Sequence, residues 1–234
     1  MKQYILLENI SKTYDKNNNA PNDSDKTQIL NIEEIKIPLG EFVAILGYSG
    51  SGKSTLMNIL SLLDIPDLKH ITTGRLPKIT YYLLNETIEI TYEQCSDPES
   101  CSPSSSNITV TVEQKNGERE ILKACALRSN YFSYIFQHAY LHPNFDVEDN
   151  IKAPLVISDR KSGLNIDELI ASAGLEGQKK RYINDLSGGE QQRTAILRGL
   201  VKQVPVIIGD ELTNNLDQDR ARQLMGLFKN QVES

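Results

Sequence analysis

Apolar segments separated by polar loops organise the first third of the chain. Tyr4–Ile10 and Ile29–Ile37 are predicted strands on either side of an Asn/Asp/Ser-rich loop. Phe42–Leu46 (FVAIL) is a short and nearly unbroken apolar run, which is typical of a strand buried on both faces of a parallel sheet. The apolar residues of LMNILSLL then predict a buried helix. The predicted order is therefore strand, glycine-rich loop, helix.

The pattern changes between Leu76 and Cys125. Segments rich in Thr, Ile, Val and Tyr show partial alternation there, which predicts antiparallel strands. Asn116-Gly117 is a predicted hairpin turn, and the Ser/Pro-rich residues 94–107 separate two of the strands. This stretch is therefore predicted to form an antiparallel β subdomain.

The second half of the chain reads mainly as helices. Apolar periodicity predicts helices over Val147–Ile157, Ile166–Ala173, Ser187–Val201 and Arg220–Val232, and the apolar run Val204–Ile208 predicts another buried strand. Strands and helices mixed in this order predict an α/β protein.

Composition narrows the class of protein. Hydrophobic residues make up 39% of the chain and charged residues 24%, which is ordinary for a globular protein. The net charge of −6 and the lack of a Lys/Arg run argue against a nucleic-acid partner. No apolar run reaches about 18 residues and no signal core is present, so we expect a cytoplasmic protein. Three scattered cysteines favour free thiols over a disulfide framework or a zinc site.

The string GYSGSGKST fits the phosphate-binding pattern G-x-x-x-x-G-K-[ST]. Its glycines let backbone N–H groups surround phosphate oxygens, and the following helix adds its positive N-terminal end. Lys53 is predicted to reach the β- and γ-phosphates, and the Ser54 hydroxyl to bind Mg²⁺. The predicted nucleotide-binding residues of this loop are Gly47, Ser49, Gly50, Ser51, Gly52, Lys53, Ser54 and Thr55.

Two acidic residues follow the apolar strand of VPVIIGDE. Carboxylates at the carboxyl end of such a strand face the crevice where ligands bind in an open α/β sheet. Asp210 is predicted to hold Mg²⁺, and Glu211 to act as the general base that polarises the attacking water. Downstream of a phosphate-binding loop, this pair is more plausibly catalytic than structural.

The string LSGGEQQR carries a family resemblance. Ser187, Gly188 and Gly189 open an apolar-periodic helix, which by itself predicts an anion site at a helix N-terminus. The eight residues resemble the signature motif of ABC ATPases, and they lie between a phosphate-binding loop and an acidic strand end, as in that family.

The resemblance extends over most of the chain and assigns further residues. YIFQHAYLHPNFDVEDNI is similar to the family's Q-loop, which implies that Gln137 lies beside Mg²⁺ and the attacking water; without the family, Gln137 is a plain surface residue. Tyr14 occupies the place of the aromatic residue that stacks on adenine, although packing is the alternative. TNNLD is similar to the D-loop and implies that Asp217 lies at a domain–domain interface.

The resemblance implies a fold and a way of working. The expected fold is α/β, with a P-loop NTPase core of the ABC ATPase type, an antiparallel β subdomain and an α-helical signature subdomain over residues 138–199, all within a single domain of residues 1–234. Two such domains associate head-to-tail, and each ATP lies between one P-loop and the other domain's signature. The motifs most resemble the lipoprotein-release and macrolide-export branch, which implies Mg²⁺ as cofactor, a membrane permease subunit as partner and a peripheral place on the inner face of the membrane.

Three departures from the family pattern qualify this prediction. Leu212 follows Glu211 where the family usually has Pro, which is expected to loosen Glu211. Gln137 follows Lys53 by 84 residues, an unusually long distance that we assign to an insertion over residues 76–125. Such an insertion is either a surface excursion, which costs little loop entropy, or a partner contact.

The third departure concerns the switch histidine of the family, which follows the D-loop helix. The histidines of this chain are His70, His138 and His142, and all of them precede the D-loop. We therefore expect either a chain that is cut short at its C-terminal end or a domain that binds ATP with impaired hydrolysis. The leading hypothesis is an ATP-hydrolysing subunit that powers an ABC transporter, and the alternative is an ATP-dependent dimerising regulator or clamp.

Overall fold

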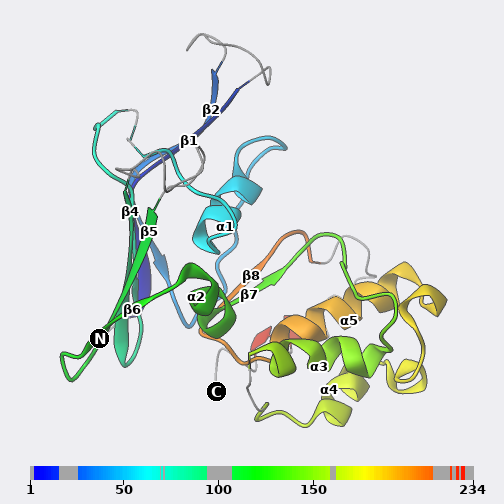
Figure 1. Ribbon diagram of the computed structural model, residues 1–234. Helices are drawn as coiled ribbons and strands as arrows, with labels where there is room; N and C mark the ends of the chain where they lie inside the picture. Colours follow the sequence, from blue (N-terminus) through cyan, green and yellow to red (C-terminus); the bar gives the residue numbers. More distant parts are fainter. Residues whose placement is uncertain are drawn as a thin grey trace, which may run out of the picture. The chain divides into compact units, whose positions relative to one another are not determined.

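The computed structural model describes residues 3–15, 26–68, 70, 72–93, 107–158, 162–212, 222, 225–226 and 228–229. The chain divides into two compact units, Met1–Arg128 and Ser129–Ser234, which are described separately below (Figure 1). The first unit is built on a sheet and the second on helices. Within the described residues, no helix combines the length and the apolar character that crossing a bilayer requires.

The first unit contains a six-stranded sheet in the order β2-β1-β3-β4-β5-β6, and every neighbouring pair is antiparallel. The strands are β1 (Tyr4–Asp15), β2 (Lys26–Pro38), β3 (Lys78–Tyr82), β4 (Glu86–Glu93), β5 (Asn107–Gln114) and β6 (Arg119–Leu122). The Gly117 N–H donates to the Gln114 carbonyl (2.9 Å) in the predicted hairpin turn. The antiparallel strands predicted within residues 76–125 are confirmed, while their designation as an insertion stays a prediction.

One face of this sheet is buried under the helix α1 (Lys53–Leu60). Alternate residues of neighbouring strands pair across that face, as Ile79 does with Ile90 and Ile90 with Val110, and all three are inaccessible to solvent. Burying each such side chain contributes about 1.5–3 kcal/mol. The hydroxyl of buried Tyr81 donates to the Leu60 carbonyl (2.6 Å), which ties the end of α1 to the sheet.

Phe42–Leu46, predicted as a buried strand, forms neither a strand nor a buried segment. The exposed fractions of Phe42 and Leu46 are 52% and 89%. A strand needs a neighbour that shares its hydrogen bonds, and β2 ends at Pro38, which has no N–H to extend the ladder. The parallel pair among the described residues, β7 with β8, belongs to the second unit. The prediction identified the apolar run correctly, but the run lacks pairing within its own unit.

The second unit places helices beside a short parallel ribbon of two strands. The elements are α2 (Ala124–Tyr131), which crosses the unit boundary, β7 (Phe132–Ile135), α3 (Val147–Ile157), α4 (Ile166–Ser172), α5 (Gly188–Leu200) and β8 (Val206–Gly209). The predicted helices over residues 147–157, 166–173 and 187–201 are confirmed. Those residues of the predicted helix 220–232 that the structure describes are helical. The sequence did not predict α2, because Leu127 is its one fully buried apolar residue and no periodicity stands out.

A single apolar cluster joins α3, α4 and α5 (Figure 1). Val147, Ile151 and Leu197 are inaccessible to solvent at its centre. Gly199 lets α5 approach β7 closely, because a Cβ at this position would lie 2.5 Å from Ile135 Cγ1. This contact fixes the signature helix against the strand that leads to Gln137.

Candidate functional site

The phosphate-binding loop leads directly into α1 in the first unit. Gly52 is the residue before the first turn, with a φ of 89°, in the left-handed region that glycine adopts without cost. A Cβ at Gly52 would lie 2.9 Å from the Ile29 carbonyl oxygen and 2.8 Å from Leu30 Cδ2. The loop therefore fits against β2 only with glycine at this position. Its approach to the sheet places the positive end of α1 at the surface, where Ser51 and Ser54 are exposed.

Lys53 bends back over this loop. Its ammonium group donates to the carbonyls of Gly47 (2.9 Å) and Tyr48 (2.8 Å). An ammonium group has three N–H donors, so two of them hold it over the loop and the third can reach a phosphate oxygen. The predicted contact of Lys53 with the β- and γ-phosphates stays a prediction.

Tyr14 lies at the end of β1 and is 43% exposed. Its hydroxyl donates to Asp64 Oδ2 (2.7 Å), and the side chain of Thr55, in the first turn of α1, also hydrogen-bonds to it. Burial and the bond to Asp64 raise the pKa of Tyr14, which keeps the hydroxyl protonated as a donor at neutral pH. The predicted adenine platform is therefore linked to the phosphate-binding loop through Thr55.

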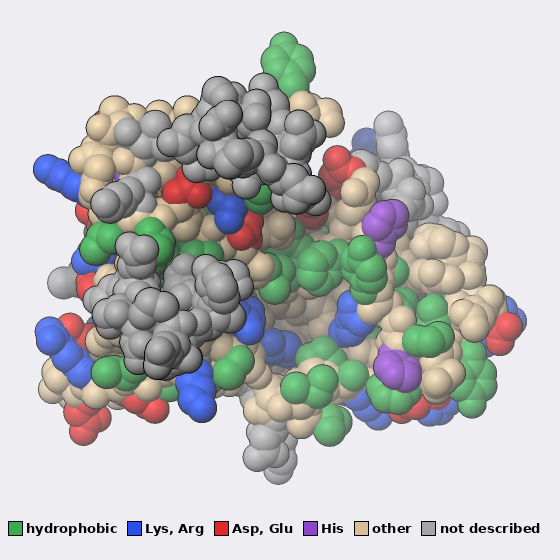
Figure 2. Space-filling model, turned by 45° about the horizontal axis from the view of Figure 1, so that its top comes forward, with side chains coloured by type: hydrophobic (Ala, Val, Ile, Leu, Met, Phe, Trp, Pro, Cys, Tyr) green, Lys and Arg blue, Asp and Glu red, His purple; other side chains and the backbone are tan. Residues whose placement is uncertain are grey.

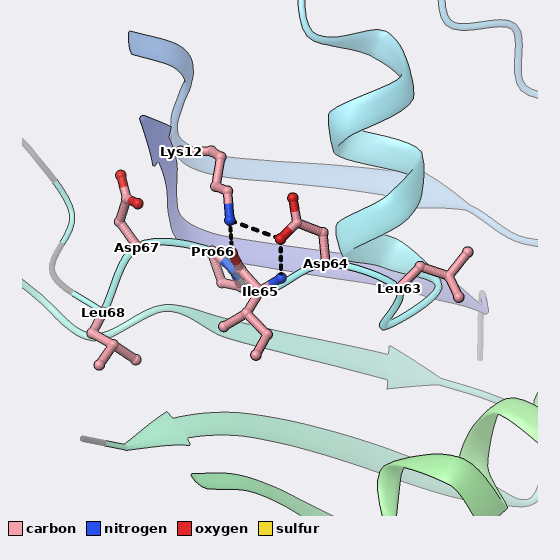
Figure 3. Close-up of a pocket in the computed structure, with 7 residues that line it drawn as sticks. All are labelled: Lys12, Leu63, Asp64, Ile65, Pro66, Asp67 and Leu68. Carbon is pink, nitrogen blue, oxygen red and sulfur yellow. Dashed lines mark hydrogen bonds and ion pairs between the residues drawn. The ribbon is translucent and has the colours of Figure 1, made fainter. Parts of the chain in front are cut away.

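A pocket of about 440 Å³ opens beside this cluster (Figure 3). It is lined by Lys12 from β1 and by the segment that follows α1: Leu63, Asp64, Ile65, Pro66, Asp67 and Leu68. Lys12 and Asp64 point toward one another at its edge and form an ion pair (2.7 Å). The lining of the pocket therefore combines three charged residues with four apolar ones.

The two strands of the second unit bring Gln137 and Glu211 together. β7 and β8 run parallel, with Ile135 opposite Gly209, and the Asp210 N–H extends this ladder by donating to the Ile135 carbonyl (3.0 Å). One step further along, Gln137 Nε2 donates to Glu211 Oε2 (2.6 Å). Residues 74 positions apart thus meet at the carboxyl ends of parallel strands, the place where α/β sheets bind ligands.

Leu212 anchors the turn that carries Glu211. The Glu211 backbone has a φ of 50°, an unfavourable conformation for a non-glycine residue. The Leu212 side chain folds back onto Gly209, where a Cβ would lie 2.6 Å from Leu212 Cδ1, and it packs against the apolar cluster of the helices. The expected loosening of Glu211 is therefore opposed by this packing.

Tyr134 is a member of this site that the sequence did not indicate. Burial, together with the negative charge of Asp210, raises the pKa of Tyr134 to about 12. A phenol that stays protonated beside Asp210 is a hydrogen-bond donor over the whole physiological pH range. An aromatic residue three positions before Gln137 is the one signal that could have suggested it.

The signature motif forms a capping box at the start of α5. The Ser187 N–H donates to Glu190 Oε2 (2.8 Å), the Ser187 hydroxyl donates to the same oxygen (2.7 Å), and the Glu190 N–H donates to the hydroxyl (3.4 Å). These bonds from Ser187 lower the pKa of Glu190. Ser187 and Gly188 are exposed, and a Cβ at Gly188 would meet no described heavy atom within 4 Å. The N-terminal end of α5 is thus accessible to an anion.

Two polar side chains, one partly exposed and one buried, hold the segment between Gln137 and α3. Arg198 of α5 donates to the carbonyls of Ala139 (3.0 Å) and Tyr140 (2.8 Å). Asn150 of α3, 1% exposed, accepts from the His142 N–H and donates to the carbonyls of residues 142, 145 and 146. The signature helix and the Q-loop segment are therefore joined by hydrogen bonds to the backbone.

Comparison with known proteins identifies the family. The ABC transporter family model matches residues 30–214. The lipoprotein-releasing system ATP-binding protein LolD of Bordetella avium is 30% identical over 227 residues, which cover 96% of this chain and 80% of that protein. The chain belongs to the ABC transporter family.

Other relatives agree with this assignment. The macrolide export ATP-binding/permease protein MacB of Shigella flexneri is 32% identical over 97% of this chain, which spans 29% of that protein. A dimeric structure of the ATP-binding cassette MJ0796 bound to ADP and Pi matches 98% of this chain and 83% of its own, with 25% identity and a TM-score of 0.65. The expected α/β fold of an ABC ATPase and the resemblance to the lipoprotein-release and macrolide-export branch are confirmed.

Within this ABC ATPase, the structure brings some of the predicted residues together. Gln137 contacts Glu211, Lys53 covers its loop, and Tyr14 is linked to Thr55. Asp217 and the rest of TNNLD lie outside the described residues. The P-loop and Ser54 belong to the first unit and Asp210 to the second, so a magnesium site shared by Ser54, Gln137 and Asp210 stays a prediction.

Sequence reasoning missed Asp64, Asn150 and Arg198. Their contacts reach residues up to 59 positions away, and the identity of a single polar residue gives no sign of such a partner. Only Asn150 carries a signal, since it follows an N-capping Asp146 by four residues and can reach back to the loop before the helix.

An ion-pair network connects the start of α3 with the segment before the signature. The carboxylate of Glu148, 11% exposed, binds Lys152, Lys180 (2.8 Å) and Lys179 (3.5 Å). Hydrogen bonds from Lys152 and then Lys180 lower the pKa of Glu148 to about 2. In addition to these ion pairs, the Glu148 N–H donates a backbone hydrogen bond to the Lys179 carbonyl (3.2 Å). The network thus fixes the chain that enters the signature motif.

Replacing Glu148 by Gln is expected to lower the free energy of unfolding by about 1 kcal/mol at pH 7, because Lys152 and Lys180 are largely exposed and solvent screens the pairs. A carboxyl whose pKa is lowered by folding stabilises the protein above its unfolded pKa, near 4.5, and this stabilisation is lost as the pH falls toward 2. Urea unfolding of both proteins at pH 7 and pH 3 measures it. An equal difference at the two pH values would contradict the prediction.

Proposed function

We propose that the chain is the ATP-hydrolysing subunit of a membrane transporter and works as a head-to-tail pair, with each ATP held between the P-loop of one copy and the signature of the other. The observation that carries the proposal is the Gln137–Glu211 hydrogen bond at the ends of two parallel strands. It supplies an oriented carboxylate at the ligand-binding edge of an ABC ATPase.

The residues present suit Mg²⁺ as the companion of ATP. This cation prefers hard oxygen ligands and usually keeps several waters. Ser54 offers a hydroxyl and Asp210 a carboxylate. The amide nitrogen of Gln137 donates to Glu211, so the amide oxygen is the atom of this side chain that would bind Mg²⁺. When bound, Mg²⁺ would neutralise charge on the β- and γ-phosphates.

The chain's own residues would carry the remaining steps. Lys53 and the P-loop N–H groups hold the phosphates in line with a water molecule. Glu211 accepts a proton from that water as its oxygen bonds to the γ-phosphorus and the bond to the β–γ bridging oxygen breaks, which yields ADP and phosphate. Gln137 keeps the carboxylate of Glu211 in place through its N–H donor.

A membrane permease subunit is the proposed partner. LolD and MacB, by their names, serve lipoprotein release and macrolide export. Exposed apolar side chains of the second unit supply a surface for such a partner, and the face in Figure 2 shows hydrophobic side chains at the surface near histidines. The exposed apolar side chains of the second unit include Tyr140, Phe145, Val156, Ile157 and Tyr182. The subunit would then lie on the inner face of the membrane, and purification of the native complex would identify the permease.

Mixing two inactive variants tests the paired site. Lys53→Ala removes the P-loop lysine, and Ser187→Arg blocks the signature, so each protein alone should lose ATP turnover. A mixed dimer contains one site with an intact P-loop and an intact signature. An equal mixture is therefore expected to regain about a quarter of the wild-type turnover, since half of the dimers are mixed and one site in each is complete.

Vanadate-sensitive phosphate release measures this recovery, with each variant mixed with itself as the control. A mixture that stays inactive, although both variants dimerise with wild-type chain, would contradict the shared site. Turnover per chain that does not depend on protein concentration would do so as well, because a site built from two copies needs the dimer.

A further inference from the structure

Two charged side chains, Lys12 and Asp64, meet behind Tyr14. Lys12 donates to Asp64 Oδ1 (2.7 Å) and to the Ile65 carbonyl (2.5 Å), and the Ile65 N–H donates to the same Oδ1 (2.7 Å) (Figure 3). The other oxygen, Oδ2, accepts from the Tyr14 hydroxyl (2.7 Å). The two carboxylate oxygens of Asp64 are therefore divided between the backbone and Lys12 on one side and Tyr14 on the other.

Lys12 also contacts the Tyr14 ring directly. Its Nζ lies 5.2 Å from the ring centroid, within the range of a cation–π interaction. Lys12 is 14% exposed in its side chain, so its charge is largely withdrawn from solvent. One face of the ring is thus covered by Lys12 and its hydroxyl is tied to Asp64, while 43% of the residue remains exposed.

We infer that Asp64 and Lys12 are positioning residues for Tyr14, which hold its ring in the orientation that stacks on the base of the nucleotide. This inference rests on the proposed function, in which Tyr14 is the adenine platform. A half-exposed side chain at a strand end otherwise loses rotamer freedom when a ligand binds, and ordering it beforehand removes that cost. Asp64 and Lys12 touch Tyr14 rather than the nucleotide.

The charges of the cluster support this arrangement. Burial would raise the pKa of Asp64, but hydrogen bonds from Lys12, Tyr14 and Ile65 outweigh it and lower the pKa. Asp64 is therefore an anion that accepts a hydrogen bond from a neutral phenol, and such a charge-assisted bond is stronger than a neutral one. The Thr55 contact places the same hydroxyl beside the first turn of the P-loop helix.

Asp64→Asn alters the Tyr14 contact selectively. Asn has a single acceptor oxygen, which the Ile65 N–H and Lys12 retain, so its NH₂ group faces the Tyr14 hydroxyl and a donor replaces an acceptor. ATP affinity should fall about 5-fold, whereas the affinity for inorganic triphosphate, which has no base to stack, should change less than about 2-fold. Calorimetric titration of the full chain with each ligand gives the ratio of the two affinities.

The matched variant Tyr14→Phe keeps the ring and removes the hydroxyl. It should lower the same affinity ratio by about 5-fold, and adding Asp64→Asn to it should lower the ratio no further, because both changes remove the same charge-assisted bond from the Tyr14 hydroxyl to the Asp64 carboxylate. The inference would be overturned if the double variant lowered the affinity ratio by the product of the two single effects. An equal loss of affinity for ATP and for triphosphate in Asp64→Asn would overturn it as well. If Asp64→Asn does not fold, an unchanged ratio in Tyr14→Phe alone overturns it.

Tyr14→Ala separates this inference from the proposed function. Loss of the ring should lower the ATP-to-triphosphate affinity ratio by about 10-fold or more. A ratio that does not change in Tyr14→Ala would remove Tyr14 as the adenine platform and the inference with it. A lowered ratio in Tyr14→Ala with an unchanged ratio in Asp64→Asn would overturn the positioning role alone.

Discussion

Replacing Glu211 by Gln is expected to reduce ATP turnover by about 10³-fold while ATP affinity changes less than about 2-fold. In the proposed function this carboxylate accepts the proton of the attacking water, and a positioned general base contributes about 10²–10⁴-fold. Gln has nearly the same volume, and its amide oxygen can still accept from Gln137 Nε2, which lies 2.6 Å from the carboxylate. The variant therefore removes the base without removing the contact.

Phosphate release at saturating ATP measures turnover, and calorimetric titration measures affinity. Glu176→Gln is the matched control, because Glu176 is an exposed carboxylate of the same unit outside the site, and it should keep wild-type turnover. Residual turnover within about tenfold of wild type in Glu211→Gln would rule out Glu211 as the general base. Equal losses of binding and turnover would instead indicate a structural role.

Turnover by the wild-type chain also decides between the two functions that the sequence leaves open. A regulator or clamp with impaired hydrolysis would bind ATP and dimerise, and the Glu211→Gln variant would then behave like wild type. The geometry favours hydrolysis, since Leu212 packs on Gly209 and the helical core and so supports the strained Glu211 backbone. Leu212, the residue that departs from the family pattern, thus supports the backbone of the proposed general base.

The helices of the second unit could be predicted because their start signals are local. Asp146, Asn165 and Ser187 precede α3, α4 and α5, and each side chain accepts a backbone N–H at the helix start. Periodic apolar positions then mark the buried face. These signals depend on residues within a few positions of one another, so the sequence displays them directly.

Phe42–Leu46 was predicted wrongly because burial and pairing are not local properties. Its apolar run is indistinguishable in sequence from that of β8, which pairs with β7 along four residues. Glu211 could be assigned from its place at the end of an apolar strand downstream of the phosphate-binding loop, whereas Gln137 could be assigned only through the family resemblance. Their contact with one another depends on the register of two strands and joins residues 74 positions apart. The contact of Asp64 with Tyr14 could be predicted neither from the local sequence pattern nor from the family resemblance. A single acidic residue after a helix gives no sign that it binds a Tyr 50 positions earlier.

Replacing Gly52 by Ala is expected to lower ATP affinity by about 10²-fold and the free energy of unfolding by about 2–5 kcal/mol. A left-handed φ of 89° costs an Ala residue about 1–2 kcal/mol, and overpacking against a fixed neighbour adds about 1–3 kcal/mol. That neighbour is the Ile29 carbonyl oxygen, 2.9 Å from the new Cβ. The loop must therefore move away from β2, and its backbone N–H groups then no longer point together toward the phosphates.

Gly117→Ala is the control that isolates the steric part. Gly117 has a similar φ of 84°, lies in a hairpin turn outside the site, and a Cβ there would meet no described heavy atom within 4 Å. It should lose only the conformational part, about 1–2 kcal/mol, and keep wild-type ATP affinity. Urea unfolding and ATP titration of both variants give the comparison. Equal losses of stability in the two proteins, or wild-type ATP affinity in Gly52→Ala, would show that the contact with β2 does not shape the phosphate-binding loop.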